Sequence, residues 1–194
     1  MTQMSMARAG RTTPEMEAVA RDEKISIDTL REEIARGTII IPKNKKHDQV
    51  HPVGIGAGLA TKVNANIGSS SDYADPEKEV EKAVTAEKAG AHAIMDLSTG
   101  GDLSSIRKKI IASVKTIIGT VPIYQATVRS VADKEAIINM TADDLFKVME
   151  EQAREGVDFF TVHCGVTRDA VERLRQQGRL MNIVSRGGSF LTTW

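Results

Sequence analysis

The chain has 194 residues with 26 basic and 26 acidic side chains, and this balance argues against nucleic acid or a membrane surface as a partner. Its one cysteine, Cys164, excludes an internal disulfide and any cluster of cysteine ligands within these residues. No apolar run approaches the roughly 18 residues that span a bilayer, and the polar first residues do not form a signal peptide, so we expect a cytoplasmic protein.

The first 52 residues predict a small N-terminal arm and cap. A helix is expected to begin after Thr13, because threonine is a good N-cap and Pro14 is preformed for the first helical turn. Gly37 is expected to stop a second helix. The expected segments are a loose arm over 1–13, the helix after Thr13, a helix over about 27–35, a strand over 38–41 and a solvated basic loop over 43–47.

From residue 53 onward, predicted strands alternate with predicted helices. The expected strands cover 61–67, 91–97, 121–125, 158–163 and 182–185. The expected helices cover 76–89, 102–117, 141–155 and 168–177. The glycine-rich residues 54–58 precede a strand and are expected to form a loop. Such an alternation indicates right-handed βαβ units and a parallel sheet.

The predicted fold class is therefore α/β, and the regular period favours a TIM-type (β/α)8 barrel. With about five βα units the barrel is incomplete, so residues 53–194 are expected to be the first part of a barrel catalytic domain that follows the cap over 1–52. An open, apolar sheet edge is unusual in a finished domain, which predicts a truncated chain. A doubly wound open sheet is the alternative, although no Gly-x-Gly-x-x-Gly turn follows a strand.

Polar or small residues follow each predicted strand. In a barrel these strand ends meet at one mouth, so they predict one convergent pocket. Ser185, Arg186 and Gly187 suit an anion, because arginine offers paired donors and glycine lets backbone N–H groups approach; a plain tight turn is the alternative. His163 can donate to a ligand or handle a proton near neutral pH, or it is a structural strand-end histidine.

Other strand-end residues also have two readings. Asn64 and Asn66 are expected on opposite faces of their strand, so only one of them points into the mouth, unless they cap a loop. Met95 belongs either to the core or to the pocket, and Tyr124 packs its ring and presents its hydroxyl. Asp96 is expected to bond the backbone of the Ser-Thr-Gly-Gly turn that follows it.

Five different motifs follow one another along the chain. They are Thr-Pro-Glu-Met-Glu from Thr13, Lys-Val-Asn-Ala-Asn-Ile-Gly from Lys62, Met-Asp-Leu-Ser-Thr-Gly-Gly from Met95, Gly-Thr-Val-Pro-Ile-Tyr-Gln-Ala from Gly119 and Ser-Arg-Gly-Gly-Ser from Ser185. Together they resemble the phosphomethylpyrimidine synthase family, radical-SAM enzymes of thiamine biosynthesis. The resemblance covers essentially the whole chain and also implies a (β/α)8 barrel.

The resemblance implies conversion of 5-aminoimidazole ribonucleotide to 4-amino-5-hydroxymethyl-2-methylpyrimidine phosphate by a homodimer. It implies S-adenosylmethionine, a [4Fe–4S] cluster and a zinc-type metal as cofactors, with their ligands beyond residue 194 and no metal ligand or catalytic residue assigned within the chain. Carried over residue by residue, the family's substrate contacts are Asn66, Met95, Tyr124, His163, Ser185, Arg186 and Gly187.

The chain departs from the family in its cysteines. Family members end with a Cys-x-x-Cys-x-x-x-x-Cys motif, and a cluster that binds SAM needs three thiolates, whereas this chain has only Cys164. We therefore expect the chain alone to be inactive. Two alternatives stay open, namely a paralogous 5-hydroxybenzimidazole synthase that uses the same ribonucleotide and cofactors, and a non-catalytic ribonucleotide-binding module.

Overall fold

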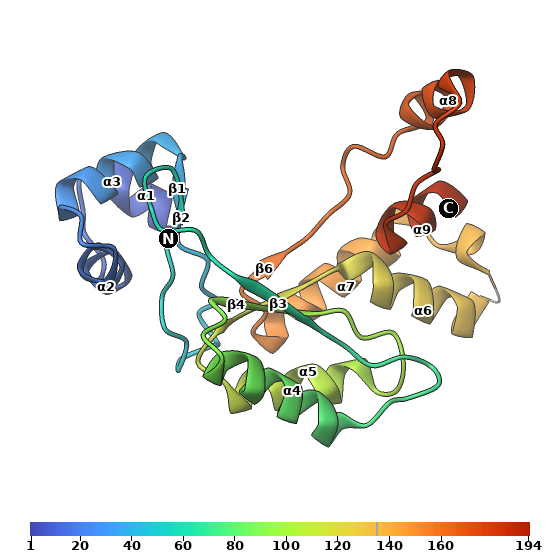
Figure 1. The fold of residues 1–194 in the computed structure, drawn as a ribbon, viewed down its shortest axis with the longest axis horizontal. Helices are drawn as coiled ribbons and strands as arrows, with labels where there is room; N and C mark the ends of the chain where they lie inside the picture. Colours follow the sequence, from blue (N-terminus) through green and yellow to red (C-terminus); the bar gives the residue numbers. More distant parts are fainter. Residues whose placement is uncertain (135) are drawn as a thin grey trace.

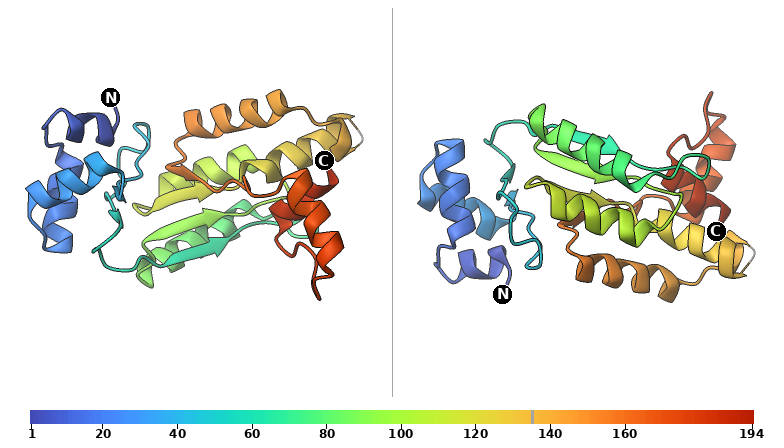
Figure 2. Two further views of the ribbon diagram at one scale, coloured as in Figure 1. Left: turned by 90° about the horizontal axis from the view of Figure 1, so that it is seen from above. Right: turned by 90° about the horizontal axis from the view of Figure 1, so that it is seen from below.

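The computed structural model describes residues 1–134 and 136–194, which form three parts (Figure 1). A helical lobe lies at one end, a parallel sheet with its helices occupies the middle, and two short helices lie at the other end (Figure 2). Among the described residues, no helix combines the length and the apolar character that a membrane crossing needs.

The N-terminal lobe consists of three helices and a small antiparallel ribbon. Its elements are α1 (Gln3–Arg8), α2 (Pro14–Glu23), α3 (Ile27–Arg36), β1 (Ile39–Ile40) and β2 (Ile55–Gly56). Thr13 caps α2 as expected, and the helix and strand predicted over 27–35 and 38–41 are confirmed as α3 and β1. The pairing of β1 with β2 crosses the domain boundary predicted at residue 52.

The expectation of a loose arm over 1–13 is wrong, because its first residues form α1. Thr2 and Ser5 make a capping box, in which each side chain accepts a hydrogen bond from the other residue's backbone N–H. Ala7 is buried in the core of the lobe. Packing thus stabilises a six-residue helix that would be marginal in isolation.

Four parallel strands form the central sheet in the order β3-β4-β5-β6. They are β3 (Asn64–Ile67), β4 (Ala93–Asp96), β5 (Ile117–Thr120) and β6 (Phe159–Phe160). The helices are α4 (Pro76–Lys88), α5 (Leu103–Ser113), α6 (Pro122–Lys134), the 3-10 helix η1 (Ile137–Asn139), α7 (Ala142–Glu155), α8 (Arg168–Gln177) and α9 (Arg186–Thr193). The predicted α/β class and parallel sheet are confirmed, and the described strands form an open sheet.

The two faces of the sheet bury different clusters. Ile94 and Ile118 are completely buried in a cluster with residues of α4 and α5. Met95 points to the opposite face, because successive residues of a strand alternate. It packs in a second cluster with residues of α6, α7 and α9, which places it between the sheet and the C-terminal end of the chain.

Two predicted strands are wrong. The segment over 121–125 is the start of α6, because Pro122 suits the first helical position, where its missing N–H loses no hydrogen bond. The actual strand is β5, whose two isoleucines are completely buried between neighbouring strands. Residues 182–185 pair with none of the described strands; Ser185 instead caps α9 by accepting a hydrogen bond from the Gly188 N–H at 3.0 Å.

The loop over 43–47 is not simply a solvated basic loop, because it docks the lobe on the sheet. His47 is only 2% exposed, and its Nδ1 lies 2.8 Å from Asp158 Oδ2. The other oxygen of Asp158 accepts the Asn44 N–H at 2.7 Å, and Oδ2 also accepts the Ile118 N–H of β5 at 2.8 Å. One buried carboxylate therefore holds both the loop and the sheet.

This docking predicts a pH-dependent stability. Burial alone would lower the pKa of His47, but the hydrogen bond and the negative charge of Asp158 outweigh it and raise the pKa above 6.5. Because the pKa of His47 is higher in the folded state, its protonated form stabilises the fold. This stabilisation is complete below pH 6.5 and is lost as the pH rises through the raised pKa. We expect the melting temperature, followed by circular dichroism, to fall across this window, and less steeply in His47→Gln.

The matched control is His51→Gln, because His51 bonds Asp22 at 2.7 Å on the surface, where its side chain is 60% exposed. We expect this variant to keep the wild-type pH dependence. An unchanged slope in His47→Gln would contradict the role of the buried pair.

Candidate functional site

The carboxyl ends of the strands face the end of the molecule that holds α8 and α9 (Figure 2). Three strand ends and the first turns of α6 and α9 contribute polar or aromatic side chains there. Asn66 of β3 is the register partner of Met95 of β4, so these two residues lie side by side on adjacent strands. Met95 in turn packs in one cluster with Tyr124 of α6 and Phe190 of α9.

Tyr124 and Arg186 form the centre of this site. The guanidinium carbon of Arg186 lies 5.2 Å from the centroid of the Tyr124 ring, within the range of a cation–π interaction. Phe190, one turn further along α9, meets the same ring edge-on at 5.8 Å and 85°. Arg186 Nη1 also donates to the carbonyl oxygen of Leu97 at 3.4 Å, which ties the start of α9 to the loop after β4.

His163 packs directly against the first turn of α9. A Cβ atom built on Gly187 would lie 2.1 Å from Cε1 of the His163 ring, so only glycine leaves room for the imidazole there. Among the residues that the structure describes, Nδ1 of His163 is buried and has no hydrogen-bond partner. A buried polar atom without a partner costs free energy, and a bound ligand is one way to satisfy it.

The first turn of α9 favours an anion. Its backbone N–H groups carry the partial positive charge of a helix N-terminus, and Arg186 adds a full positive charge at the same place. Ser185 uses its hydroxyl oxygen to cap the helix. Gly187 and Gly188 are buried, and the N–H of Gly188 is the group that donates to this hydroxyl.

The structure thus connects the sequence-predicted residues through a short series of contacts, and substrate binding by them stays a prediction. The prediction that Asn64 and Asn66 face opposite sides is wrong, because residues two apart share a face and Asn64 Nδ2 donates to Asn66 Oδ1 at 2.9 Å. The expected turn bond of Asp96 is confirmed, since its Oδ1 accepts the Ser98 N–H at 3.0 Å.

A buried polar cluster that no sequence motif predicted lies under the site, centred on Arg107 of α5. Arg107 is 2% exposed and reaches Asp96 at the end of β4, with Nε 3.8 Å from Oδ2. Burial raises the pKa of Asp96 despite the hydrogen bond from Ser98 and the charge of Arg107. The sequence signal for this cluster is the position of Arg107 between Ile106 and Ile110, both of which lie on the apolar face of α5.

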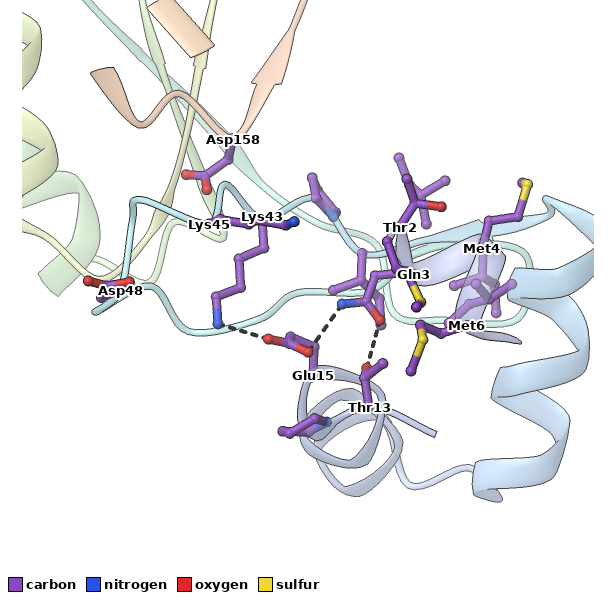
Figure 3. A pocket seen from close by; sticks show the side chains of 17 residues that line it. Thr2, Gln3, Met4, Met6, Thr13, Glu15, Lys43, Lys45, Asp48 and Asp158 are labelled. Atoms are coloured by element: carbon purple, nitrogen blue, oxygen red, sulfur yellow. Dashed lines mark hydrogen bonds and ion pairs between the residues drawn. The ribbon is translucent and has the colours of Figure 1, made fainter. Parts of the chain in front are cut away.

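A separate cavity of about 890 Å³ lies between the N-terminal lobe and the loop that docks the lobe on the sheet (Figure 3). Four of its polar side chains are linked by hydrogen bonds: Glu15 accepts from Lys43 Nζ at 3.0 Å and from Gln3 at 3.1 Å, and Thr13 donates to Gln3 at 2.7 Å. Burial would raise the pKa of Glu15, but these hydrogen bonds outweigh it and hold the pKa at about 2. We therefore assign this cavity a structural role.

The residues present do not fit a [4Fe–4S] cluster or a zinc-type metal. Cys164 is the one cysteine of the sequence and is exposed, whereas a SAM-binding cluster needs three thiolates. Within 1–134 and 136–194, no three His, Cys, Asp or Glu side chains are grouped so that they could hold a metal ion.

A sequence model described as the Radical SAM ThiC family matches residues 2–194. Curated relatives named phosphomethylpyrimidine synthase are 56% identical in Moorella thermoacetica, 55% in Methanocaldococcus jannaschii and 53% in Desulforudis audaxviator. Each alignment covers all 194 residues of this chain and 45% of the relative. The chain therefore spans less than half the length of these relatives.

Proposed function

The chain belongs to the radical SAM ThiC family, as its motifs predicted, and from this we propose that it forms the substrate-binding part of a phosphomethylpyrimidine synthase. The substrate of the whole protein is then 5-aminoimidazole ribonucleotide, and its product is 4-amino-5-hydroxymethyl-2-methylpyrimidine phosphate. The observation that carries the proposal is the stack of Arg186 on Tyr124 beside the buried, unsatisfied Nδ1 of His163.

Each residue of the site has a role that suits this ribonucleotide. Arg186 and the first N–H groups of α9 bind the phosphate, because both present positive charge. Tyr124 and Met95 provide an apolar surface for the imidazole ring and the ribose. The imidazole of His163 and the amide of Asn66 bond polar groups of the substrate, which orients it at the site.

The family also implies SAM and an iron–sulfur cluster, which together supply a radical. Since the residues of this chain do not fit the cluster, we assign no step of radical formation to them. The chain's own residues bind and orient the ribonucleotide and exclude water from one side of it. We expect these 194 residues alone to bind the substrate without converting it.

We further propose that the parallel sheet belongs to a (β/α)8 barrel with the N-terminal lobe as its cap, and the pairing of β1 with β2 extends this cap beyond residue 52. The strand order, the helices between the strands and the polar strand ends support this proposal. A homodimer and a cytoplasmic location stay predictions. The names of the curated relatives favour the pyrimidine product over 5-hydroxybenzimidazole.

Substitution of Gly187 tests the site directly. In Gly187→Ala the new Cβ pushes the His163 ring out of place, so we expect the affinity for 5-aminoimidazole ribonucleotide to fall about tenfold or more. Isothermal titration calorimetry measures this change. The matched control is Gly165→Ala, where a Cβ meets no atom within 4 Å and the affinity should not change. Equal affinities of the two variants would exclude the proposed role of His163.

A further inference from the structure

Arg107 occupies an unusual position for a charged residue. It lies on α5 between the sheet and the surrounding helices and is 2% exposed. Its guanidinium pairs with Glu155 at the end of α7, and its Nη2 donates to Gln125 Oε1 at 2.6 Å on the first turn of α6. Its Nε lies 3.8 Å from Asp96 Oδ2 at the end of β4. One buried side chain thus contacts three elements of the fold.

The contacts continue beyond Arg107 into a buried network. Gln125 Oε1 also accepts from Gln152 Nε2 of α7 at 2.8 Å. The amide oxygen of Gln152 accepts from the Thr120 hydroxyl at 2.7 Å, at the end of β5. Gln125, Gln152 and Thr120 are each at least nine-tenths buried. The network therefore links the ends of β4 and β5 to the first turn of α6.

Two members of the network are direct sequence neighbours of site residues. Asp96 follows Met95 on β4, and successive strand residues point to opposite faces of the sheet. The contact with Arg107 holds Asp96 toward α5, and this keeps Met95 on the opposite face. Gln125 follows Tyr124 on α6, and consecutive helix residues point in directions about 100° apart. Holding Gln125 therefore fixes the rotation of the first turn of α6, and with it the direction of the Tyr124 ring.

Stability alone does not explain such a network. Well-packed apolar side chains of similar volume often replace a buried ionic network without loss of stability. A network of fixed hydrogen bonds instead selects one arrangement of the elements that it joins.

We propose that Arg107 is a positioning residue, which aims Tyr124 and Met95 at the substrate through Gln125 and Asp96 without touching the substrate itself. This inference rests on the proposed function of the site. It explains why a charged side chain lies in the core: the site requires one orientation of Tyr124 and Met95, and the buried network of Arg107 selects that orientation.

The test compares Arg107→Met with Arg129→Met in the 194-residue chain. Arg129 is the matched control, because it joins α6 to Glu151 of α7 at the surface, with Nη2 2.8 Å from Oε2. We expect Arg107→Met to bind 5-aminoimidazole ribonucleotide about tenfold more weakly and Arg129→Met to bind normally. In Arg107→Met combined with Tyr124→Ala, the two losses should be less than additive, because one residue acts through the other.

A measurement without ligand separates this inference from the proposed function. Nuclear Overhauser effects between the Tyr124 and Phe190 rings, whose centroids are 5.8 Å apart, should weaken in Arg107→Met and persist in Arg129→Met. Unchanged ring contacts in Arg107→Met would overturn the inference. If wild type does not bind the ribonucleotide, the proposed function fails, and the ring contacts still decide whether Arg107 positions Tyr124.

A second variant covers the case in which Arg107→Met does not fold. Gln125→Met removes the link between Arg107 and α6 while Arg107 keeps its ion pair with Glu155. We expect the same loss of affinity and of ring contacts. Normal affinity and normal ring contacts in a folded Gln125→Met would overturn the inference.

Discussion

Arg186→Ala is expected to weaken binding of 5-aminoimidazole ribonucleotide by roughly 10- to 150-fold, because a hydrogen bond to a charged group contributes about 1.5–3 kcal/mol. Arg186 is exposed at the first turn of α9, and its stack on the Tyr124 ring holds the guanidinium in one direction. The substitution removes the full positive charge and leaves only the helix N-terminus to attract the phosphate. Isothermal titration calorimetry of both proteins measures the difference.

Two further variants make this measurement specific. Arg175→Ala removes the same type of side chain from α8, where Arg175 lies on the surface 3.8 Å from Glu172, so we expect unchanged affinity. Arg186→Lys keeps the charge but loses the planar donors and their stack, so we expect only partial recovery. Binding by Arg186→Ala at the wild-type level would exclude this residue from the site.

Asp158→Ala is expected to lower the free energy of unfolding by about 3–5 kcal/mol, which is the usual effect of breaking a buried charge pair. The carboxylate is fully buried and bonds His47, so its removal leaves the histidine without its charged partner. The same change takes the hydrogen-bond acceptor from the N–H groups of Asn44 and Ile118. Urea denaturation, with the midpoint and slope fitted separately, measures the loss.

The control for this prediction is Asp22→Ala. Asp22 also bonds a histidine, His51, at 2.7 Å, but both side chains are well exposed. An exposed pair contributes about 1 kcal/mol or less, so the free energy of unfolding should hardly change. Similar losses in Asp22→Ala and Asp158→Ala would contradict the idea that burial makes the Asp158 pair important for joining the lobe to the sheet.

Helix ends were the most predictable part of the fold. Thr13 caps α2 as expected, and Gly37, Gly156 and Gly178 end α3, α7 and α8 in the left-handed conformation. These signals are local, because a cap satisfies N–H groups two or three residues away and a C-terminal glycine relieves a local steric conflict. Sequence alone therefore placed most helices correctly.

Short strands were less predictable for the opposite reason. β5 falls between the helix expected over 102–117 and the strand expected over 121–125, because its two apolar residues fit a helix end as well as a strand. Its identity depends on hydrogen bonds to β4 and β6, which are distant in sequence. Residues 182–185 hold a similar apolar pair, Ile183 and Val184, but they pair with none of the described strands and so form no strand.

Local patterns in the sequence were enough to predict the α/β class and most helices and, through the motifs, the family and the polar residues at the strand ends. Only the tertiary structure brought Arg186 onto Tyr124 and Gly187 onto His163. It also joined His47 to Asp158 across 111 residues and Arg107 to Glu155 across 48. The physical reason is the sequence separation over which each interaction acts. Caps and helical periodicity depend on residues a few positions apart, whereas a buried charge pairs with whichever partner the fold brings close in space, and no local pattern encodes that partner.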